Sequence, residues 1–343
     1  MSSPHRLALG LVGAGHLGKI HAACLAQLAD VIEVVGVLDA DPAAAGAVAE
    51  TYGWRALASR DELFAALTPG SRPAAVDVVT PTTSHYELAY ASLAAGCHAF
   101  VEKPLAATAA EAAALEALAA RCGRVVQVGH VERFNPAFRE VAAGGIRPLF
   151  IEAHRLAQFN PRALDVPVVL DLMIHDIDLA LSLVDAEVER VSASGVGVVG
   201  EAVDIASARL DFANGATANL TASRVSLKNM RKLRLFARDA YIGVDLLAKS
   251  AEVVTLSEQD PEAPSGFRLP TPEGVREVAV AQPTILPTNA ILEELRAFAK
   301  TIRDGGAPVV SARDGRRALE IAERILDDMR ARAMLRHQSP ERS

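Results

Sequence analysis

The sequence predicts an α/β protein: a doubly wound parallel sheet, then an α+β domain with an open, mainly antiparallel sheet. Apolar strand-like runs alternate with helical patterns up to residue 128, which favours parallel strands joined by right-handed helical crossovers. After Gly129 the strand-like runs follow one another, and Asn214-Gly215 between two of them is a hairpin signal. The expected division is 1–128, 129–336 and a flexible tail, 337–343.

Composition limits the kind of protein this is. The chain has 343 residues, half of them apolar, which is enough for two hydrophobic cores. A net charge of -7 argues against nucleic-acid binding and against a basic membrane-binding surface. No stretch predicts a transmembrane helix, and the short polar start leaves no room for a signal peptide. We therefore expect a cytoplasmic protein.

The cysteines give no sign of a disulfide framework or a metal site. Cys24, Cys97 and Cys122 are an odd number without metal-ligand spacing. We expect all three to be small buried residues in a reducing compartment.

The first strand runs into a glycine-rich turn. Leu7 to Val12 is a short apolar run, and the helical pattern Lys19 to Leu28 follows the turn. Glycines let the backbone turn tightly and approach a pyrophosphate, and the N-terminus of the helix offers free N–H groups to the phosphates. The expected dinucleotide contacts are Gly13, Gly15, His16, Leu17 and Gly18.

The second strand, Val31 to Leu38, ends in Asp39. An acid at this position accepts hydrogen bonds from both ribose hydroxyls of a dinucleotide. Ala40 and Asp41 follow, and no Arg or Lys is nearby in the sequence to meet a 2′-phosphate. Strand, glycine turn, helix, strand and acid together predict a Rossmann domain that binds NAD rather than NADP.

The remaining elements of the first domain place further candidates at strand ends. Ligands of such sheets bind beyond the carboxyl ends of the strands. Thr80 and Pro81 follow one strand, and Glu102 and Lys103 follow the next. His85 fits either a surface position in the first turn of a helix or the wall of a nicotinamide pocket. The expected elements are Ala43 to Tyr52, Asp61 to Leu67, Val76 to Val79, Tyr86 to Ala95, Ala99 to Val101, Thr108 to Arg121 and Val125 to Val128.

Lys103 stands between Glu102 and Pro104. Proline biases the residue before it toward an extended backbone. Beside a positively charged nicotinamide ring, a lysine with a lowered pKa suits proton transfer near neutral pH. The alternative interpretation is a solvated Lys–Glu pair on the surface.

A second cluster of ionisable residues lies on a predicted helix in the second domain. At 3.6 residues per turn, Asp171, His175 and Asp178 fall on one line between two apolar stripes, while Asp176 points to a face that looks solvated. Perturbed ionisable groups in such surroundings are frequent at functional sites. The alternative is a structural ion network on a buried helix.

The second domain is predicted to be rich in strands. Asp260 to Gly274 is expected to be a surface loop, and the helices Thr288 to Asp304 and Ala312 to Arg332 follow it. The open sheet has a face that usually needs cover, so we expect a homodimer or homotetramer through that face. The expected strands are Leu149 to Leu156, Val188 to Val199, Ala206 to Phe212, Ala216 to Ala222 and Lys232 to Phe236, with Tyr241 to Asp245 and Val253 to Leu256 as further candidates.

These motifs resemble those of the Gfo/Idh/MocA oxidoreductase family. The resemblance rests on the glycine turn, on Glu102-Lys103-Pro104 and on the helix with Asp171 and His175, and it covers nearly the whole chain. It implies that Lys103, Asp171 and His175 act at the substrate. Under this hypothesis His175 takes or relays the proton of a ring hydroxyl, Lys103 hydrogen-bonds the same oxygen, and Asp171 orients the groups. Asp178 is expected to be structural.

Three further stretches are similar to a branch of the family that oxidises the 3-hydroxyl of UDP-N-acetylglucosamine, on the way to a 3-amino sugar of the lipid A type. The stretches are 129–136, 169–178 and 229–234. The basic residues Lys228, Arg231 and Lys232 fit either a diphosphate contact or a solvated strand entry. The expected substrate contacts are Lys103, His130, Arg133, Asn135, Arg155, Asp171, His175 and Arg231, and no metal is expected.

Other functions stay open from the sequence. A dehydrogenase of a free sugar or an inositol would use the same motifs. An NAD-assisted glycosidase would oxidise its substrate only transiently. A non-catalytic dinucleotide sensor would need neither Lys103 nor His175.

Overall fold

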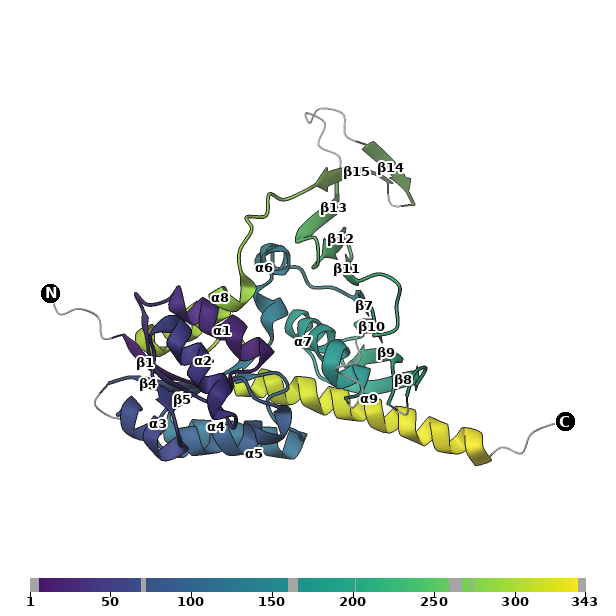
Figure 1. Cartoon of the computed structure of the whole chain (residues 1–343). Helices are drawn as coiled ribbons and strands as arrows, with labels where there is room; N and C mark the ends of the chain where they lie inside the picture. Colours follow the sequence, from purple (N-terminus) through teal and green to yellow (C-terminus); the bar gives the residue numbers. More distant parts are fainter. Residues whose placement is uncertain are drawn as a thin grey trace. The chain divides into compact units, whose positions relative to one another are not determined.

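The computed structural model describes residues 6–68, 72–159, 166–200, 202–258, 267–272 and 274–338. The chain forms two compact units, which are described separately below (Figure 1). Unit 1 is Met1–Phe134 with Asn289–Leu319, and unit 2 is Asn135–Thr288 with Glu320–Ser343. Of the expected flexible tail, 337–343, the last five residues lie outside the described part, and the C-terminal helix continues to Gln338.

Unit 1 contains a parallel sheet in the order β3-β2-β1-β4-β5-β6. The chain moves outward from β1 in one direction and then returns to β4 on its other side. The strand order therefore reverses between β1 and β4, and sheets of this kind bind ligands beyond the carboxyl ends of the strands at such a point. The predicted doubly wound sheet is therefore confirmed. Its strands are β1 Leu7–Val12, β2 Ile32–Leu38, β3 Ala56–Leu57, β4 Ala74–Val78, β5 His98–Glu102 and β6 Val126–Gly129.

Two helices of unit 1 begin with the side-chain caps that the sequence predicts, whereas Ser84 at the start of α4 makes no capping hydrogen bond. Ser59 accepts the backbone N–H of Glu62 at the start of α3, and Thr108 and Glu111 form a reciprocal capping box at the start of α5. The helices are α1 His16–Ala26, α2 Pro42–Tyr52, α3 Arg60–Leu67, α4 His85–Ala94, α5 Ala109–Cys122 and α8 Ala290–Asp304, with the short turns η1 Thr82–Ser84 and η2 Val131–Phe134.

Helix α8 belongs to unit 1 although it follows the second sheet in the sequence. Its Leu295 and Phe298 are fully buried in one core with Leu9, Leu25 and Phe100 of the first sheet and α1. The sequence analysis expected a continuous second domain, 129–336, whereas the structure groups Asn289–Leu319 with unit 1. An amphipathic pattern shows that α8 buries one face, but not which sheet receives it.

Unit 2 contains a mixed sheet in the order β14-β15-β13-β12-β11-β7-β10-β9-β8. All its described pairs are antiparallel except β7 with β10. The Asn214-Gly215 hairpin is confirmed, with Gly215 at φ +85° between β9 and β10. The strands are β7 Phe150–Leu156, β8 Val188–Val196, β9 Ile205–Phe212, β10 Thr217–Ser223, β11 Met230–Ala237, β12 Ala240–Asp245, β13 Ser250–Glu258, β14 Phe267–Thr271 and β15 Gly274–Ala281.

One predicted loop is wrong in part. The expected surface loop, Asp260 to Gly274, contains β14, which pairs with β15 as an antiparallel hairpin. Most side chains of these two strands are exposed. Pro270 within β14 and the Pro- and Glu-containing sequence before it are typical of a loop, and the hairpin itself buries little apolar surface.

In the described part of unit 2, helices pack against the face of the sheet to which Ile151 and Ala153 point. Along β7, Ile151 and Ala153 are buried and alternate with half-buried Glu152 and His154. The covering helix α7 Ile174–Leu183 packs against β7 and β10, while α6 Pro136–Ala143 packs against β12 and β13 (Figure 1). The last helix, α9 Ala312–Gln338, contributes its residues from Glu320 onward to this unit, where Arg324 donates to the carbonyl of Val188.

Two expectations from composition can be compared with the structure. Cys24 and Cys97 are buried, but Cys122 is exposed, because it ends α5 beside the C-terminal glycine. In the part of the chain that the structure describes, no helix combines the length and the apolar character needed to cross a bilayer.

Candidate active site

The glycine turn after β1 is closed on one side and open on the other. Gly13 has φ +108°, and a Cβ there would overlap the carbonyl of Val79 at the end of β4. A Cβ on Gly18 would overlap the carbonyl of Gly13. At Gly15 nothing lies within 4 Å of where a Cβ would be, and Gly15 and His16 are exposed. The turn therefore leaves an open cradle at the N-terminus of α1, which fits the pyrophosphate of a dinucleotide.

Asp39 is held beside this turn. One of its carboxylate oxygens accepts the backbone N–H of Ala14 at 2.6 Å, and the other accepts that of Asp41 at 2.8 Å. The side chain is only partly buried. A carboxylate fixed next to the cradle fits the ribose that a dinucleotide places beyond its pyrophosphate.

His85 connects two strand ends from inside the protein. Its Nδ1 lies 2.8 Å from the carbonyl oxygen of Pro104, and its Nε2 lies 2.9 Å from that of Thr80. The residue is 1% exposed, so it is not the surface residue that one interpretation expected. Since both ring nitrogens contact the main chain, His85 supports the Thr80 and Lys103–Pro104 segments beneath the expected cofactor edge.

Lys103 extends from the end of β5 and is half-buried, and its bond to Pro104 is cis. The backbone N–H of Lys103 donates to Oε2 of Glu102 at 3.1 Å. Glu102 is only 7% exposed, and its other oxygen lies 3.1 Å from Nε2 of His21. A solvated surface Lys–Glu pair is therefore not what the structure contains.

In unit 2 the expected catalytic helix begins with a π-helical segment, η4 Val169–Met173, and continues as α7. Asp171 lies in η4 and His175 in the first turn of α7, and both are half-buried. π-Helical segments are frequent at functional sites. Asp178 is 1% exposed, in agreement with a structural role. Asp171 and His175 are thus the accessible ionisable pair of this helix.

Asp176 forms a buried ion pair with Arg155, which neither residue was expected to do. The sequence analysis placed Asp176 on a solvated face, but it is buried and accepts two hydrogen bonds from Arg155, at 2.9 Å from Nε and 2.8 Å from Nη2. Arg155 follows Ile151 and Ala153 on the face of β7 that α7 covers. The guanidinium of Arg155, an expected substrate contact, is therefore engaged inside the unit. A helical projection cannot show that a strand supplies a charged partner.

Asn135 also has a structural role. Its Oδ1 accepts the backbone N–H of Ala137 as the N-cap of α6, and its Nδ2 donates to the carbonyl of Leu246. Two further expected substrate contacts lie in unit 1, where His130 is 1% exposed and Arg133 is half-buried. Of these residues, Arg133 is the one with an accessible side chain.

The basic cluster around the start of β11 is divided between the two faces of the sheet. Arg231 lies opposite Arg155 in the strand register, so its side chain is on the face that α7 covers. Lys232 is on the open face, 3.8 Å from a carboxylate oxygen of Asp245. Lys228 is exposed before the strand begins. The three residues therefore do not form one phosphate site, and Arg231 remains as the candidate on the side of Asp171 and His175.

Comparison with known sequences agrees with this geometry. Residues 7–130 match the model of the oxidoreductase family with an NAD-binding Rossmann fold, and residues 146–242 match the C-terminal domain of the same family. The chain belongs to the Gfo/Idh/MocA family. It is therefore an oxidoreductase with a dinucleotide-binding domain.

Several relatives of known activity cover almost the whole chain. The UDP-N-acetylglucosamine 3-dehydrogenase of Acidithiobacillus ferrooxidans is 35% identical over 92% of this chain and 95% of its own. A solved structure of that enzyme superposes with a TM-score of 0.84, at 33% identity, over 94% of this chain and 98% of that one. An inositol 2-dehydrogenase of Rhizobium meliloti is 28% identical over 92% of this chain and 94% of its own.

Several buried polar residues of unit 1 carry no assignment from the sequence, among them His21, Asp77 and Glu294. His21 interrupts the apolar side of α1, and Asp77 lies in the middle of the fully buried strand β4. A polar residue at a position that predicts burial needs a partner. That signal was present in the sequence, although it does not identify the partner.

An added methyl group should act differently at the two ends of the glycine turn: on stability at Gly18 and on NAD affinity at Gly15. Gly18→Ala should lower the free energy of unfolding by about 1–3 kcal/mol, because its Cβ meets the carbonyl of Gly13. Gly15→Ala should change it by less than about 0.5 kcal/mol, since the space there is open. Gly15→Ala should nevertheless weaken NAD binding at least about tenfold in calorimetric titration, because the methyl group occupies the pyrophosphate approach. Unchanged NAD affinity would place the cofactor elsewhere.

Proposed function

We propose that the protein is a dehydrogenase that oxidises the 3-hydroxyl of UDP-N-acetylglucosamine to a ketone with NAD as the oxidant. The observation that carries this proposal is the 35% identity, over 92% of the chain, to the Acidithiobacillus enzyme that bears this activity in its name. The inositol dehydrogenases are less similar over comparable lengths. The positions of Lys103, Asp171 and His175 at accessible points of their units support a catalytic function.

The residues of this chain handle the proton of the substrate hydroxyl. His175 accepts that proton, Lys103 hydrogen-bonds the same oxygen and shares the proton, and Asp171 orients the imidazole or the sugar. The Gly13–Gly18 turn and Asp39 hold the dinucleotide by its pyrophosphate and ribose. NAD, when bound, supplies the hydride acceptor for the carbinol carbon. Arg231 provides a cation for the diphosphate of the nucleotide sugar.

NAD rather than NADP is the proposed cofactor. The carboxylate of Asp39 is fixed beside the glycine turn by the N–H groups of Ala14 and Asp41. A 2′-phosphate would bring negative charge to this carboxylate, whereas a 2′-hydroxyl donates to it. The ratio of kcat/KM for NAD and NADP measures this preference, and a ratio at or below one would contradict it.

The catalytic assignment predicts a loss of turnover without a loss of cofactor affinity. Lys103→Ala and His175→Ala should each lower kcat about 10³-fold, because each removes a group that holds or moves the substrate proton. The Kd for NAD should change less than about twofold, since neither side chain belongs to the glycine turn. Lys300→Ala, on an exposed position of α8, is the matched control and should keep wild-type rates.

The same assay separates the substrate classes. NADH formation is followed with UDP-N-acetylglucosamine, other UDP-sugars, free sugars and inositols, and the product mass is measured. Turnover only with an inositol would contradict the nucleotide-sugar proposal. Near-wild-type rates in both Lys103→Ala and His175→Ala would contradict the catalytic assignment.

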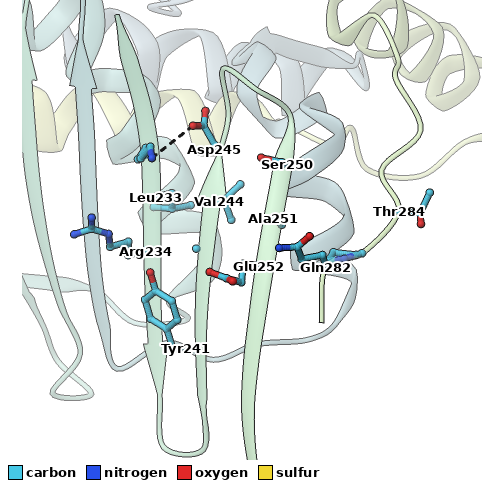
Figure 2. A pocket seen from close by; sticks show the side chains of 13 residues that line it. Leu233, Arg234, Tyr241, Val244, Asp245, Ser250, Ala251, Glu252, Gln282 and Thr284 are labelled. Carbon is cyan, nitrogen blue, oxygen red and sulfur yellow. Dashed lines mark ion pairs between the residues drawn. The ribbon is translucent and has the colours of Figure 1, made fainter. Parts of the chain in front are cut away.

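The open face of the second sheet is the proposed site of association with further copies of the chain, as a homodimer or homotetramer. Strands β11, β12 and β13 and residues Gln282 to Thr284 line a hollow of about 530 Å³ on this sheet. Figure 2 shows side chains of both charges along it, among them Arg234, Asp245 and Glu252. Nζ of Lys232 lies 3.8 Å from a carboxylate oxygen of Asp245. Mixed charges on one face suit a self-complementary contact about a two-fold axis.

Light scattering at micromolar concentration tests this association. The expected mass is that of a dimer or a tetramer of the 36.1 kDa chain. A mass of one chain would contradict it.

A further inference from the structure

Four ionisable residues meet inside unit 1, away from the solvent. His21 comes from α1, Asp77 from β4, Glu102 from β5 and Glu294 from α8. His21, Asp77 and Glu294 are 0% exposed, and Glu102 is 7% exposed. Burying four such groups is costly unless they are paired or used. The proposed mechanism uses none of them directly.

The imidazole of His21 lies between two carboxylates. Its Nδ1 is 2.9 Å from Oδ2 of Asp77, and its Nε2 is 3.1 Å from Oε1 of Glu102. Ionised carboxylates only accept hydrogen bonds, so both ring nitrogens donate when His21 is the imidazolium. Burial lowers the pKa of His21, but the charges and hydrogen bonds of Asp77 and Glu102 outweigh burial and raise that pKa well above its ordinary value. The two carboxylate contacts and the direction of this pKa shift together favour the charged form of the ring.

Glu294 completes the cluster without a hydrogen bond from either carboxyl oxygen. Burial and the negative charge of Glu102 raise the pKa of Glu294 well above its ordinary value. Atoms of His21, Glu102 and Glu294 lie within 4.8 Å of one another, so a divalent cation is the competing occupant. The geometry favours protons, because both nitrogens of His21 already lie at hydrogen-bond distance from carboxylate oxygens.

Glu102 links this cluster to Lys103. While Oε1 faces His21, Oε2 accepts the backbone N–H of Lys103 at 3.1 Å. The carboxyl group also lies against Gly129, the register partner of Glu102 on β6, where a Cβ would come within 2.7 Å of Oε1. The contact with His21 and the close packing on Gly129 together restrict the position of the Glu102 carboxylate. The same carboxylate fixes the backbone from which Lys103 extends.

We propose that His21 is a positioning residue for Lys103, acting through the Glu102 carboxylate that it holds beneath the Lys103 backbone. The bridge joins α1, which begins at the glycine turn, to the strand end that presents the lysine. The proposal rests on the proposed function, since it assigns His21 a role only if Lys103 acts in proton transfer.

His21→Gln tests the bridge, because the amide keeps a hydrogen-bond donor but removes the charge and one of the two contacts. We expect kcat to fall about 10- to 100-fold, the loss associated with a reacting group displaced by about 1 Å. KM for the sugar and the Kd for NAD should change less than about threefold. Glu102→Asp retains the negative charge but shortens the side chain, so the carboxylate reaches the Lys103 backbone less well. It should likewise lower kcat and leave KM for the sugar nearly unchanged.

His98→Gln is the matched control. His98 lies on the same strand as Glu102, but at its opposite end, and its Nδ1 accepts the backbone N–H of Val125 at 2.9 Å. Burial and the nearby charge of Arg124 lower the pKa of His98 to about 4, so its ring is neutral at pH 7.5. His98→Gln should lose some stability in thermal denaturation but retain wild-type kcat.

Nitrogen-15 NMR of the imidazoles in the cofactor-free protein provides a readout that does not depend on activity. At pH 7.5 the His21 imidazole should show both ring nitrogens protonated, and the absence of this signal in His21→Gln assigns it to His21. A neutral His21 would overturn the proposal. A stoichiometric divalent cation in the purified protein, detected by elemental mass spectrometry and lost in Glu294→Gln, would also overturn it.

The kinetic outcomes separate this proposal from the proposed function. If Lys103→Ala loses turnover but His21→Gln and Glu102→Asp keep the rate of His98→Gln, His21 is only structural and the positioning proposal fails alone. If Lys103→Ala keeps its turnover, the proposed function fails, whatever His21→Gln does. Loss of NAD binding in a folded His21→Gln variant would also overturn the proposal. It would show that His21 acts on the glycine turn at the start of α1 and not on Lys103.

Discussion

The close contact between the glycine turn and the end of β4 is the constraint on which the first unit depends. Gly13 lies so near to the carbonyl of Val79, and Gly18 so near to the carbonyl of Gly13, that a Cβ fits at neither position. This packing sets where α1 begins and leaves the open side at Gly15. Because all strands of this sheet are parallel, Asp39, Thr80 and Lys103 follow strand ends at the same edge. One backbone contact thus connects the glycine turn, the proposed cofactor cradle, with the strand end that carries Lys103, the proposed catalytic lysine.

Much of this arrangement could be predicted from the sequence, because local rules determine it. Strand, turn and capping patterns predicted the parallel sheet, the capping box at Thr108 and the Asn214-Gly215 hairpin. Two of the errors share a physical cause, which is that they depend on contacts between residues far apart in the chain. Asp176 looked solvated because its partner Arg155 lies on another element, and an amphipathic pattern did not show which core α8 joins.

The division of the basic cluster shows why sequence proximity is a poor guide to a substrate site. Arg231 and Lys232 are neighbours in the chain, but the two-residue period of a strand places them on opposite faces of the sheet. Lys232 lies on the open face with Asp245, and Arg231 lies on the face that α7 covers. The alternation of one strand thereby separates two proposed roles, oligomer contact and substrate binding, within a single charged stretch.

Oxidation at C3 of the nucleotide sugar is the central claim, and deuterium at that carbon tests it most directly. UDP-N-acetylglucosamine labelled with deuterium at C3 is incubated with enzyme and NAD, and the NADH and the sugar product are analysed by mass spectrometry. The account predicts that the deuterium moves to the reduced nicotinamide and that the oxidised sugar lacks it. NADH free of deuterium, formed together with an oxidised sugar that retains the label, would show that another carbon is oxidised and would contradict the account.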